Sequence, residues 1–110
     1  MEVHTRSVGD VSVVEVSGDV DGSTSPVLQE HVLALAQPGC KLIVDMSNVG
    51  FMSSAGLRVM LLLYRQITGN KGKVVLVGLS ESIQDTMSAT GFLKYFTTAP
   101  TFDAGLAGLQ

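Results

Sequence analysis

Cysteines and aromatic residues are few in this sequence. Cys40 is the single cysteine and tryptophan is absent, while hydrophobic residues make up 45% of the 110 positions. One cysteine excludes both an intramolecular disulfide and a metal site built from clustered thiolates. We expect Cys40 to be a small apolar side chain before a strand, in a mainly aliphatic core. The length suits one such core, so we predict a single domain over residues 1–110.

Basic residues are also scarce, and they are scattered along the chain. Seven lysines and arginines are outnumbered by ten aspartates and glutamates, giving a formal net charge of -3 and a pI near 5.1. Proteins that bind nucleic acid present a clustered basic surface to its phosphates. The composition therefore argues against a nucleic-acid partner.

Long apolar runs are missing. The longest, VMLLLY and VVLVGL, are far shorter than the roughly 20 residues that a membrane-spanning helix needs. The first ten residues, MEVHTRSVGD, lack the basic segment and apolar stretch of a secretion signal. We therefore expect a soluble, cytoplasmic protein that has no membrane partner.

Catalytic and metal-binding motifs are missing as well. The segment GLSES at 78–82 lacks the second glycine of a nucleophile elbow, and no metal-ligand spacing or glycine-rich phosphate loop occurs. His4 and His31 fall on a predicted edge strand and an amphipathic helix, where we expect solvated surface positions. Asp45 ends a strand as the phosphoaccepting aspartate of a two-component receiver does, but no acidic pair follows the first strand. We predict neither an enzyme nor a bound cofactor or metal.

Strand patterns are clear in what remains. Residues 2–8 and the segment VSVVEVSGDV (11–20) alternate on either side of Gly9-Asp10, which predicts an antiparallel hairpin. Two nearly continuous apolar runs, KLIVDM and KVVLVGL, predict strands that are covered on both faces. A short edge strand is predicted from Lys94 to Thr97.

Four helices are predicted between and after these strands. Ser25 before Pro26 is the expected N-cap of the first helix, and Ser80 that of the third, which ends near Gly91. The second follows two adjacent serines, and its core side is expected to comprise Leu57, Met60, Leu61, Tyr64 and Ile67. A weak fourth helix is marked by Phe102, Leu106 and Leu109.

The resulting element order is β-β-α-β-α-β-α-β-α. Strand–helix–strand repeats require right-handed crossovers onto a mainly parallel sheet. The sequence thus predicts an α/β fold in which a mixed, mainly parallel sheet begins with an N-terminal antiparallel hairpin and carries about four helices.

Two loops of this fold should meet at the carboxyl ends of the strands, where α/β proteins bind ligands. They are GDVDGSTS (18–25) and NVGFMSSAGLR (48–58). Helix chemistry alone allows Ser53 to be an N-cap and Ser54 a first-turn filler. It equally allows a phosphorylated hydroxyl, because a phosphate of about -1.5 to -2 charges is favoured at a helix N-terminus.

The second helix adds two features to this loop. Arg58 lies four residues after Ser54, within reach of a phosphate there. Leu62 falls on the polar side of the helix. A single exposed leucine usually has no function, but together with Phe51 and Met52 it predicts a docking surface.

Three segments resemble the STAS domain of bacterial anti-sigma-factor antagonists, namely GDVD, IVDMSNVGFMSSAGLRVMLLLYRQI and GKVVLVGLSESIQDTMSATGFLKYF. The resemblance runs from about Val11 to Phe96. It implies a mixed sheet with helices packed on it, and a partner-switching role. In that family the unmodified antagonist binds a serine-kinase anti-sigma factor and so frees a sigma factor. The kinase ends the complex by phosphorylating the antagonist, and a PP2C-type phosphatase resets it.

The resemblance also implies roles for individual residues. Ser54 matches the phosphoacceptor, and Ser53 replaces the aspartate that precedes it in the family, which makes Ser53 a second candidate. Asp21 matches the aspartate of the first loop, near the serine. Arg58 stands where the family often has a small residue, so a phosphate clamp there would be particular to this chain. The predicted partner surface comprises Asp19, Asp21, Phe51, Met52, Ser53, Ser54, Arg58 and Leu62.

One alternative function stays open. STAS-like proteins also serve as accessory subunits of lipid-transport ATPases, without phosphorylation switching. The replacement of the family's aspartate by Ser53 supports this second interpretation.

Overall fold

The computed structural model describes residues 1–109 and contains the predicted succession of strands and helices. Its elements are β1 (Glu2–Val8), β2 (Val11–Ser17), α1 (Ser25–Leu35), β3 (Lys41–Asn48), α2 (Ser54–Gly69), β4 (Lys73–Val77), α3 (Glu81–Ala89), a 3-10 helix (Leu93–Tyr95), β5 (Thr98–Ala99) and α4 (Phe102–Leu109).

The strands form one five-stranded sheet in the order β1-β2-β3-β4-β5. β1 and β2 are antiparallel and are joined through Gly9, whose φ of 60° suits the tight turn. Every later neighbouring pair is parallel. The predicted α/β fold with a mixed, mainly parallel sheet and a leading hairpin is therefore confirmed.

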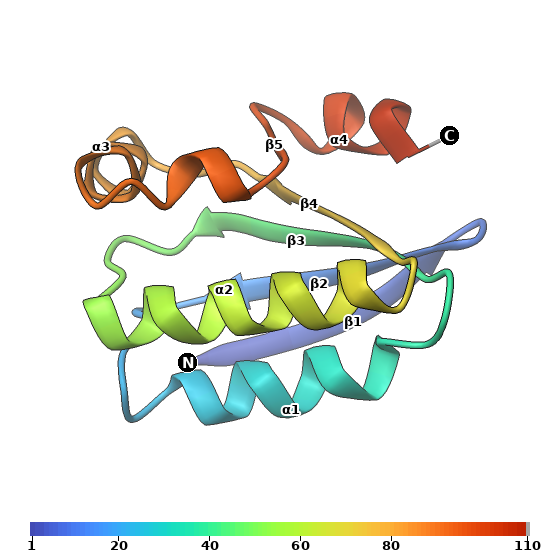
Figure 1. Ribbon diagram of the computed structural model, residues 1–110, viewed down its shortest axis with the longest axis horizontal. Coiled ribbons are helices and arrows are strands. Elements are labelled where there is room, and N and C mark those ends of the chain that lie inside the picture. The colour runs from blue at the N-terminus through green and yellow to red at the C-terminus, as the bar shows by residue number, and fades with distance from the viewer. Residues whose placement is uncertain (110) are drawn as a thin grey trace.

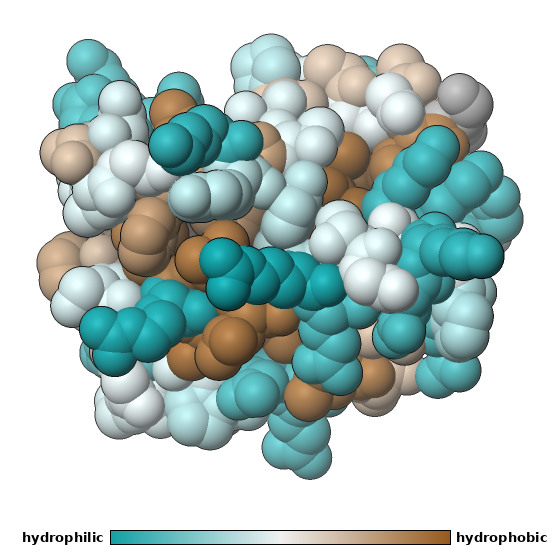
Figure 2. Space-filling view, in the orientation of Figure 1, coloured by the Kyte–Doolittle hydropathy of each residue, from teal (hydrophilic) through white to brown (hydrophobic). Residues whose placement is uncertain are grey.

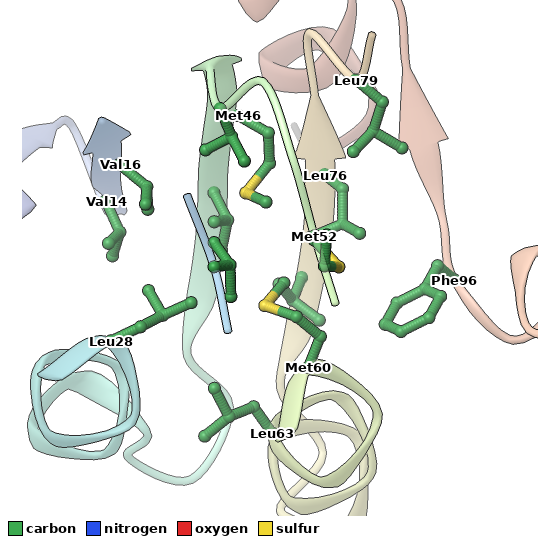
Figure 3. Close-up of a cluster of buried hydrophobic side chains, with 14 of the residues drawn as sticks. Val14, Val16, Leu28, Met46, Met52, Met60, Leu63, Leu76, Leu79 and Phe96 are labelled. Carbon is green, nitrogen blue, oxygen red and sulfur yellow. The ribbon is translucent and has the colours of Figure 1, made fainter. Parts of the chain in front are cut away.

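Helices cover both faces of the sheet. In Figure 1, α1 and α2 lie side by side along one face and α4 lies on the other. The larger core cluster, shown in part in Figure 3, joins the first face to α1, α2 and α3, and the smaller one joins the opposite face to α4. Within β3, Leu42 and Val44 enter the larger cluster while Ile43 enters the smaller one. This alternation confirms a strand that is covered on both faces.

The buried side of α2 differs slightly from the prediction. Leu57, Met60 and Ile67 are buried as expected, but Leu63 is buried with them, whereas Leu61 and Tyr64 are only half-buried. The buried side of α2 is rotated toward Leu63 because α2 packs beside α1 as well as on the sheet.

The edge of the sheet after α3 departs from the prediction. Residues Leu93–Tyr95 form a 3-10 helix rather than part of an edge strand, and pairing with β4 occurs one step later, at Thr98–Ala99. Phe96 is buried between these two pieces and packs edge to face against Tyr64, at 5.2 Å between ring centroids. Because the Phe96 ring is anchored in the core, the chain pairs with β4 only after this residue.

The predicted weak helix α4 exists despite its glycines. Gly105 lies against β4 so closely that a Cβ atom there would be 2.5 Å from Cγ1 of Val77. Close contact with the sheet thus compensates for the low helix propensity of glycine. Cys40, half-buried before β3, packs against the larger cluster as expected, and burial raises the pKa of its thiol.

Candidate functional site

Two loops meet at the carboxyl ends of β2 and β3, at the left of Figure 1. The first connects β2 to α1 and the second connects β3 to α2. Val20 in the first loop forms an isolated parallel bridge with Met52 in the second. The Val20 amide donates to the Phe51 carbonyl at 3.0 Å, and the Ser53 amide donates to the Val20 carbonyl at 2.8 Å. These two hydrogen bonds fix the first loop directly against the residues that precede α2.

Ser53 is the N-cap of α2. Its backbone is extended (φ -76°, ψ 168°), and its hydroxyl oxygen accepts a hydrogen bond from the Gly56 amide at 3.1 Å. This bond satisfies one of the amides that a helix start leaves unpaired. The capping role predicted for Ser53 is therefore confirmed.

Ser54 is the first residue of α2, and its side chain is exposed. Within residues 1–109 its hydroxyl makes no hydrogen bond that meets ordinary geometric criteria. It lies at the positive end of a 16-residue helix, beside first-turn amides. The Ser54 hydroxyl is thus accessible to solvent at the end of the helix that favours negative charge.

Gly56 allows the close approach of the two loops. A Cβ atom at this position would lie 2.6 Å from the Val20 carbonyl oxygen and 2.9 Å from Val20 Cγ1. Gly22 of the first loop faces Ala55, and a Cβ added to Gly22 would lie at an ordinary van der Waals distance, 3.7 Å, from the Cβ of Ala55. Glycine at position 56 is therefore required for α2 to approach the first loop this closely.

Asp21 organises its own loop. Its Oδ1 accepts hydrogen bonds from the amides of Ser23 and Thr24 at 2.9 and 3.0 Å, and from the Ser23 hydroxyl at 2.8 Å. The Ser23 hydroxyl, then the Thr24 and Ser23 amides, hold the pKa of this carboxyl below its ordinary value. Because Asp21 turns the chain this way, Thr24 rather than Ser25 is the N-cap residue of α1, and Ser25 is buried. The predicted cap at Ser25 was wrong.

The predicted partner surface is only partly exposed. Asp19 and Arg58 are exposed, as are Phe51 and Leu62, each with 54% of its surface accessible. Figure 2 shows hydrophobic side chains reaching the surface along α2.

Met52 does not belong to this surface, contrary to the prediction. Only 5% of it is exposed, and Figure 3 places its side chain in the core beside Met60 and Leu76. The bridge to Val20 turns Met52 inward, which leaves its neighbour Phe51 pointing to solvent.

Two residues of the site were not singled out from the sequence. Val20 holds the loops together through its backbone, and Gly56 gives it the space to do so. For Val20, the signal in the sequence was that it is an apolar residue inside the polar segment GDVDG. For Gly56, the signal for a close approach was a glycine in the first turn of a predicted helix, where glycine is unfavourable.

No group of three or more histidine, cysteine, aspartate or glutamate side chains that could hold a metal ion occurs in residues 1–109. In the same residues, no helix combines the length and the apolar character needed to cross a bilayer.

Comparison with known proteins identifies the family. A model of the STAS domain matches residues 2–105. The anti-sigma-B factor antagonist of Bacillus subtilis is 31% identical over 93 residues, which cover 84% of this chain and 85% of that protein. The chain belongs to the STAS-domain family of anti-sigma-factor antagonists.

Two further relatives agree with this assignment. BtrV of Bordetella bronchiseptica is 25% identical over 111 residues, covering 100% of this STAS domain and 96% of BtrV. The crystal structure of an anti-sigma factor antagonist from Mycobacterium paratuberculosis superimposes with a TM-score of 0.87 at 28% identity, covering 98% of this chain and 92% of that one. The resemblance noted in the sequence is confirmed.

The contact between Gly56 and Val20 can be tested by a matched pair of substitutions. Gly56→Ala should lower the free energy of unfolding by about 1–3 kcal/mol, because its methyl group overlaps the Val20 carbonyl. Gly50→Ala is the control in the same loop, since a Cβ there meets nothing within 4 Å. Urea denaturation should show a clear loss for the first variant and little change for the second. Equal midpoints would contradict the close approach.

The hydrogen bonds of Asp21 predict a pH dependence. Its pKa is lowered in the folded state from the ordinary 3.8, so its contribution to stability is present above pH 3.8 and is lost as the pH falls through the lower, folded-state pKa. Asn at this position does not titrate. The difference in thermal midpoint between the wild-type protein and Asp21→Asn should be constant above about pH 5 and should shrink in more acidic buffer. A difference that stays unchanged down to about pH 2 would contradict this role.

Proposed function

We propose that this STAS domain is a phosphorylation-controlled anti-sigma-factor antagonist. Unmodified, it binds a serine-kinase anti-sigma factor and thereby frees a sigma factor. The kinase transfers a phosphoryl group from ATP to the Ser54 hydroxyl, which ends the complex, and a PP2C-type phosphatase removes it. The observation that carries this proposal is the Ser54 hydroxyl at the start of α2, exposed and without a hydrogen-bond partner in residues 1–109, in a chain 31% identical to an anti-sigma-B factor antagonist.

The geometry favours Ser54 over Ser53 as the acceptor. The oxygen of Ser53 accepts the hydrogen bond from Gly56 that caps α2. Esterifying that oxygen would disturb the cap, and removing a cap costs about 1 kcal/mol. Ser54 has no such bond within the described residues, so its modification leaves the helix start intact.

A phosphate at Ser54 would leave the protein folded and still expel the partner. The free protein accommodates the charge because first-turn amides and the helix dipole stabilise it. In a complex the same dianion would lose its water and face the negative first loop, where Asp19 is exposed. A loss of about 3 kcal/mol of binding free energy weakens a complex by more than 100-fold.

The partner surface around Ser54 is mixed in character. Phe51, three residues before Ser54, and Leu62, eight residues after it, offer exposed apolar area, while Asp19 and Arg58 offer opposite charges. Buried aromatic and aliphatic anchors surrounded by polar groups are typical of protein–protein interfaces. We include these four residues, together with Ser53, Ser54 and Asp21, in the proposed interface and leave out Met52.

The switch predicts opposite behaviour for two variants. Ser54→Asp should weaken binding to the cognate kinase about 100-fold, by placing a charge where the phosphate would be. Ser54→Ala should bind as the wild-type protein does but accept no phosphate. Both should keep the wild-type thermal midpoint, because the Ser54 side chain has no hydrogen bond with any of residues 1–109 to lose. Calorimetric titration measures the affinities.

Tight binding by the Asp variant would contradict the switch. It would favour a constitutive binding module instead, such as the accessory subunit of a lipid-transport ATPase.

Arg58 is the proposed partner of the phosphate. It is exposed and forms no ion pair within residues 1–109, so it is free to turn toward a phosphate one helical turn away. Arg58→Ala should lower the thermal midpoint of the phosphorylated form by about 2–4 °C more than that of the free form. Arg65→Ala, an exposed arginine eleven residues after Ser54, is the control and should shift both forms equally. Equal shifts for Arg58→Ala would exclude the clamp.

A further inference from the structure

The outer edge of β4 is only partly covered. β3 pairs with β4 along its whole length, from Lys73 to Val77. On the other side, β5 is two residues long and pairs with Leu76 and Val77 alone. The first three residues of β4 therefore have no strand on their outer side, opposite β3, within residues 1–109.

Hydrogen-bond directions identify the backbone groups left open. The Lys73 amide donates to the Cys40 carbonyl, on the β3 side, while the Leu76 amide donates to the Thr97 carbonyl, on the β5 side. Successive residues of a strand present their backbone groups to alternate neighbours. The amide and carbonyl of Val74 therefore point to the uncovered edge.

A groove of about 340 Å³ lies along this edge. Its floor is β4, one wall is formed by Tyr64 and Thr68 near the end of α2, and the other by Gly108 and Leu109 at the end of α4. Figure 2 shows hydrophobic side chains recessed between α4, at the upper right, and α2, across the middle. At about 3.3 Å per residue, the uncovered stretch suits roughly three residues of an extended chain.

The charges at this end of β4 specify the partner. Lys73 lines the groove and Lys71 is exposed two residues before it, and neither forms an ion pair within residues 1–109. Lys41, on the neighbouring strand, is already paired with Asp10 at 2.9 Å. In a protein of net charge -3, this places two positive charges that have no ion-pair partner among the described residues beside an open strand edge.

We propose that this groove binds a short, acidic, extended peptide segment of a partner protein. The segment adds to the sheet beside β4, exchanging backbone hydrogen bonds with Val74 and placing a carboxylate near Lys73. The groove lies at the amino end of β4, whereas Ser54 lies beyond the carboxyl end of β3, with the length of α2 between them. A peptide held there leaves the surface around Ser54 free, so the domain can hold two partners at once.

Defined synthetic peptides test this proposal by NMR. The probe is acetyl-TETVTE-amide, and acetyl-TKTVTK-amide has the same apolar content with the opposite charge. The acidic peptide should shift the Val74 amide signal, slow its hydrogen exchange at least fivefold at saturation, and bind at least fivefold more tightly than the basic one. A peptide methylated on its backbone nitrogens should bind at least fivefold more weakly than the acidic peptide.

Variants separate this site from a general effect of charge. Lys73→Glu should reverse the order of the two peptides, whereas Lys94→Glu, the same change at an exposed lysine outside the groove, should preserve it. Gly108→Leu, at a position where a Cβ meets nothing within 4 Å, should fill the groove and weaken both peptides. This variant keeps the test available if Lys73→Glu does not fold.

Three results would overturn the proposal. One is an unchanged Val74 amide at millimolar peptide. Another is an equal loss of binding of the acidic peptide in Lys73→Glu and Lys94→Glu, which would mean that Lys73 serves only to prevent edge-to-edge aggregation. The third is full binding by the methylated peptide, which would exclude strand pairing. Because none of these readouts involves Ser54, they are independent of the proposed phosphorylation.

Discussion

The arrangement of the two loops at the carboxyl ends of β2 and β3 depends on the peptide backbone of Val20. Its amide and carbonyl hydrogen-bond to the residues just before α2, so the loop after β2 and the loop after β3 form one rigid unit. Gly56 is required because any side chain there would meet the same carbonyl. The bridge also turns Met52 into the core and leaves Phe51 exposed. The position of Ser54 at the corner of the molecule follows from these contacts.

The two adjacent serines have different physical roles. Ser53 caps α2, and aspartate and serine are among the best residues for that role. The aspartate that the family resemblance implies at this position would cap the helix as serine does. Compared with an aspartate, Ser53 leaves one negative charge fewer beside Ser54, so the unmodified surface is less acidic, while the charge that a phosphate would add is the same. Separating the cap from the free hydroxyl would allow modification without loss of the fold.

Elements with a strong repeating pattern could be predicted from the sequence, whereas those set by long-range contacts could not. The alternation in β1 and β2 and the apolar runs of β3 and β4 indicated the hairpin and the parallel sheet. A strand of two residues, such as β5, has no alternation to detect, and the segment before it was misassigned. The burial of Met52 follows from a bridge to a residue 32 positions earlier, and the rotation of α2 toward Leu63 follows from its packing beside α1. In the site, the residue types indicated Ser53 and Ser54, while Val20 acts through its backbone, which side-chain chemistry does not reveal.

The most direct test of the central claim is to locate the phosphate. The full-length protein would be incubated with its cognate serine kinase and ATP, then digested and sequenced by tandem mass spectrometry, alongside Ser53→Ala and Ser54→Ala. The exposed hydroxyl at the start of α2 predicts a single phosphate on Ser54, retained in Ser53→Ala and absent from Ser54→Ala. A phosphate found on Ser53 alone, or wild-type phosphorylation of Ser54→Ala, would contradict it.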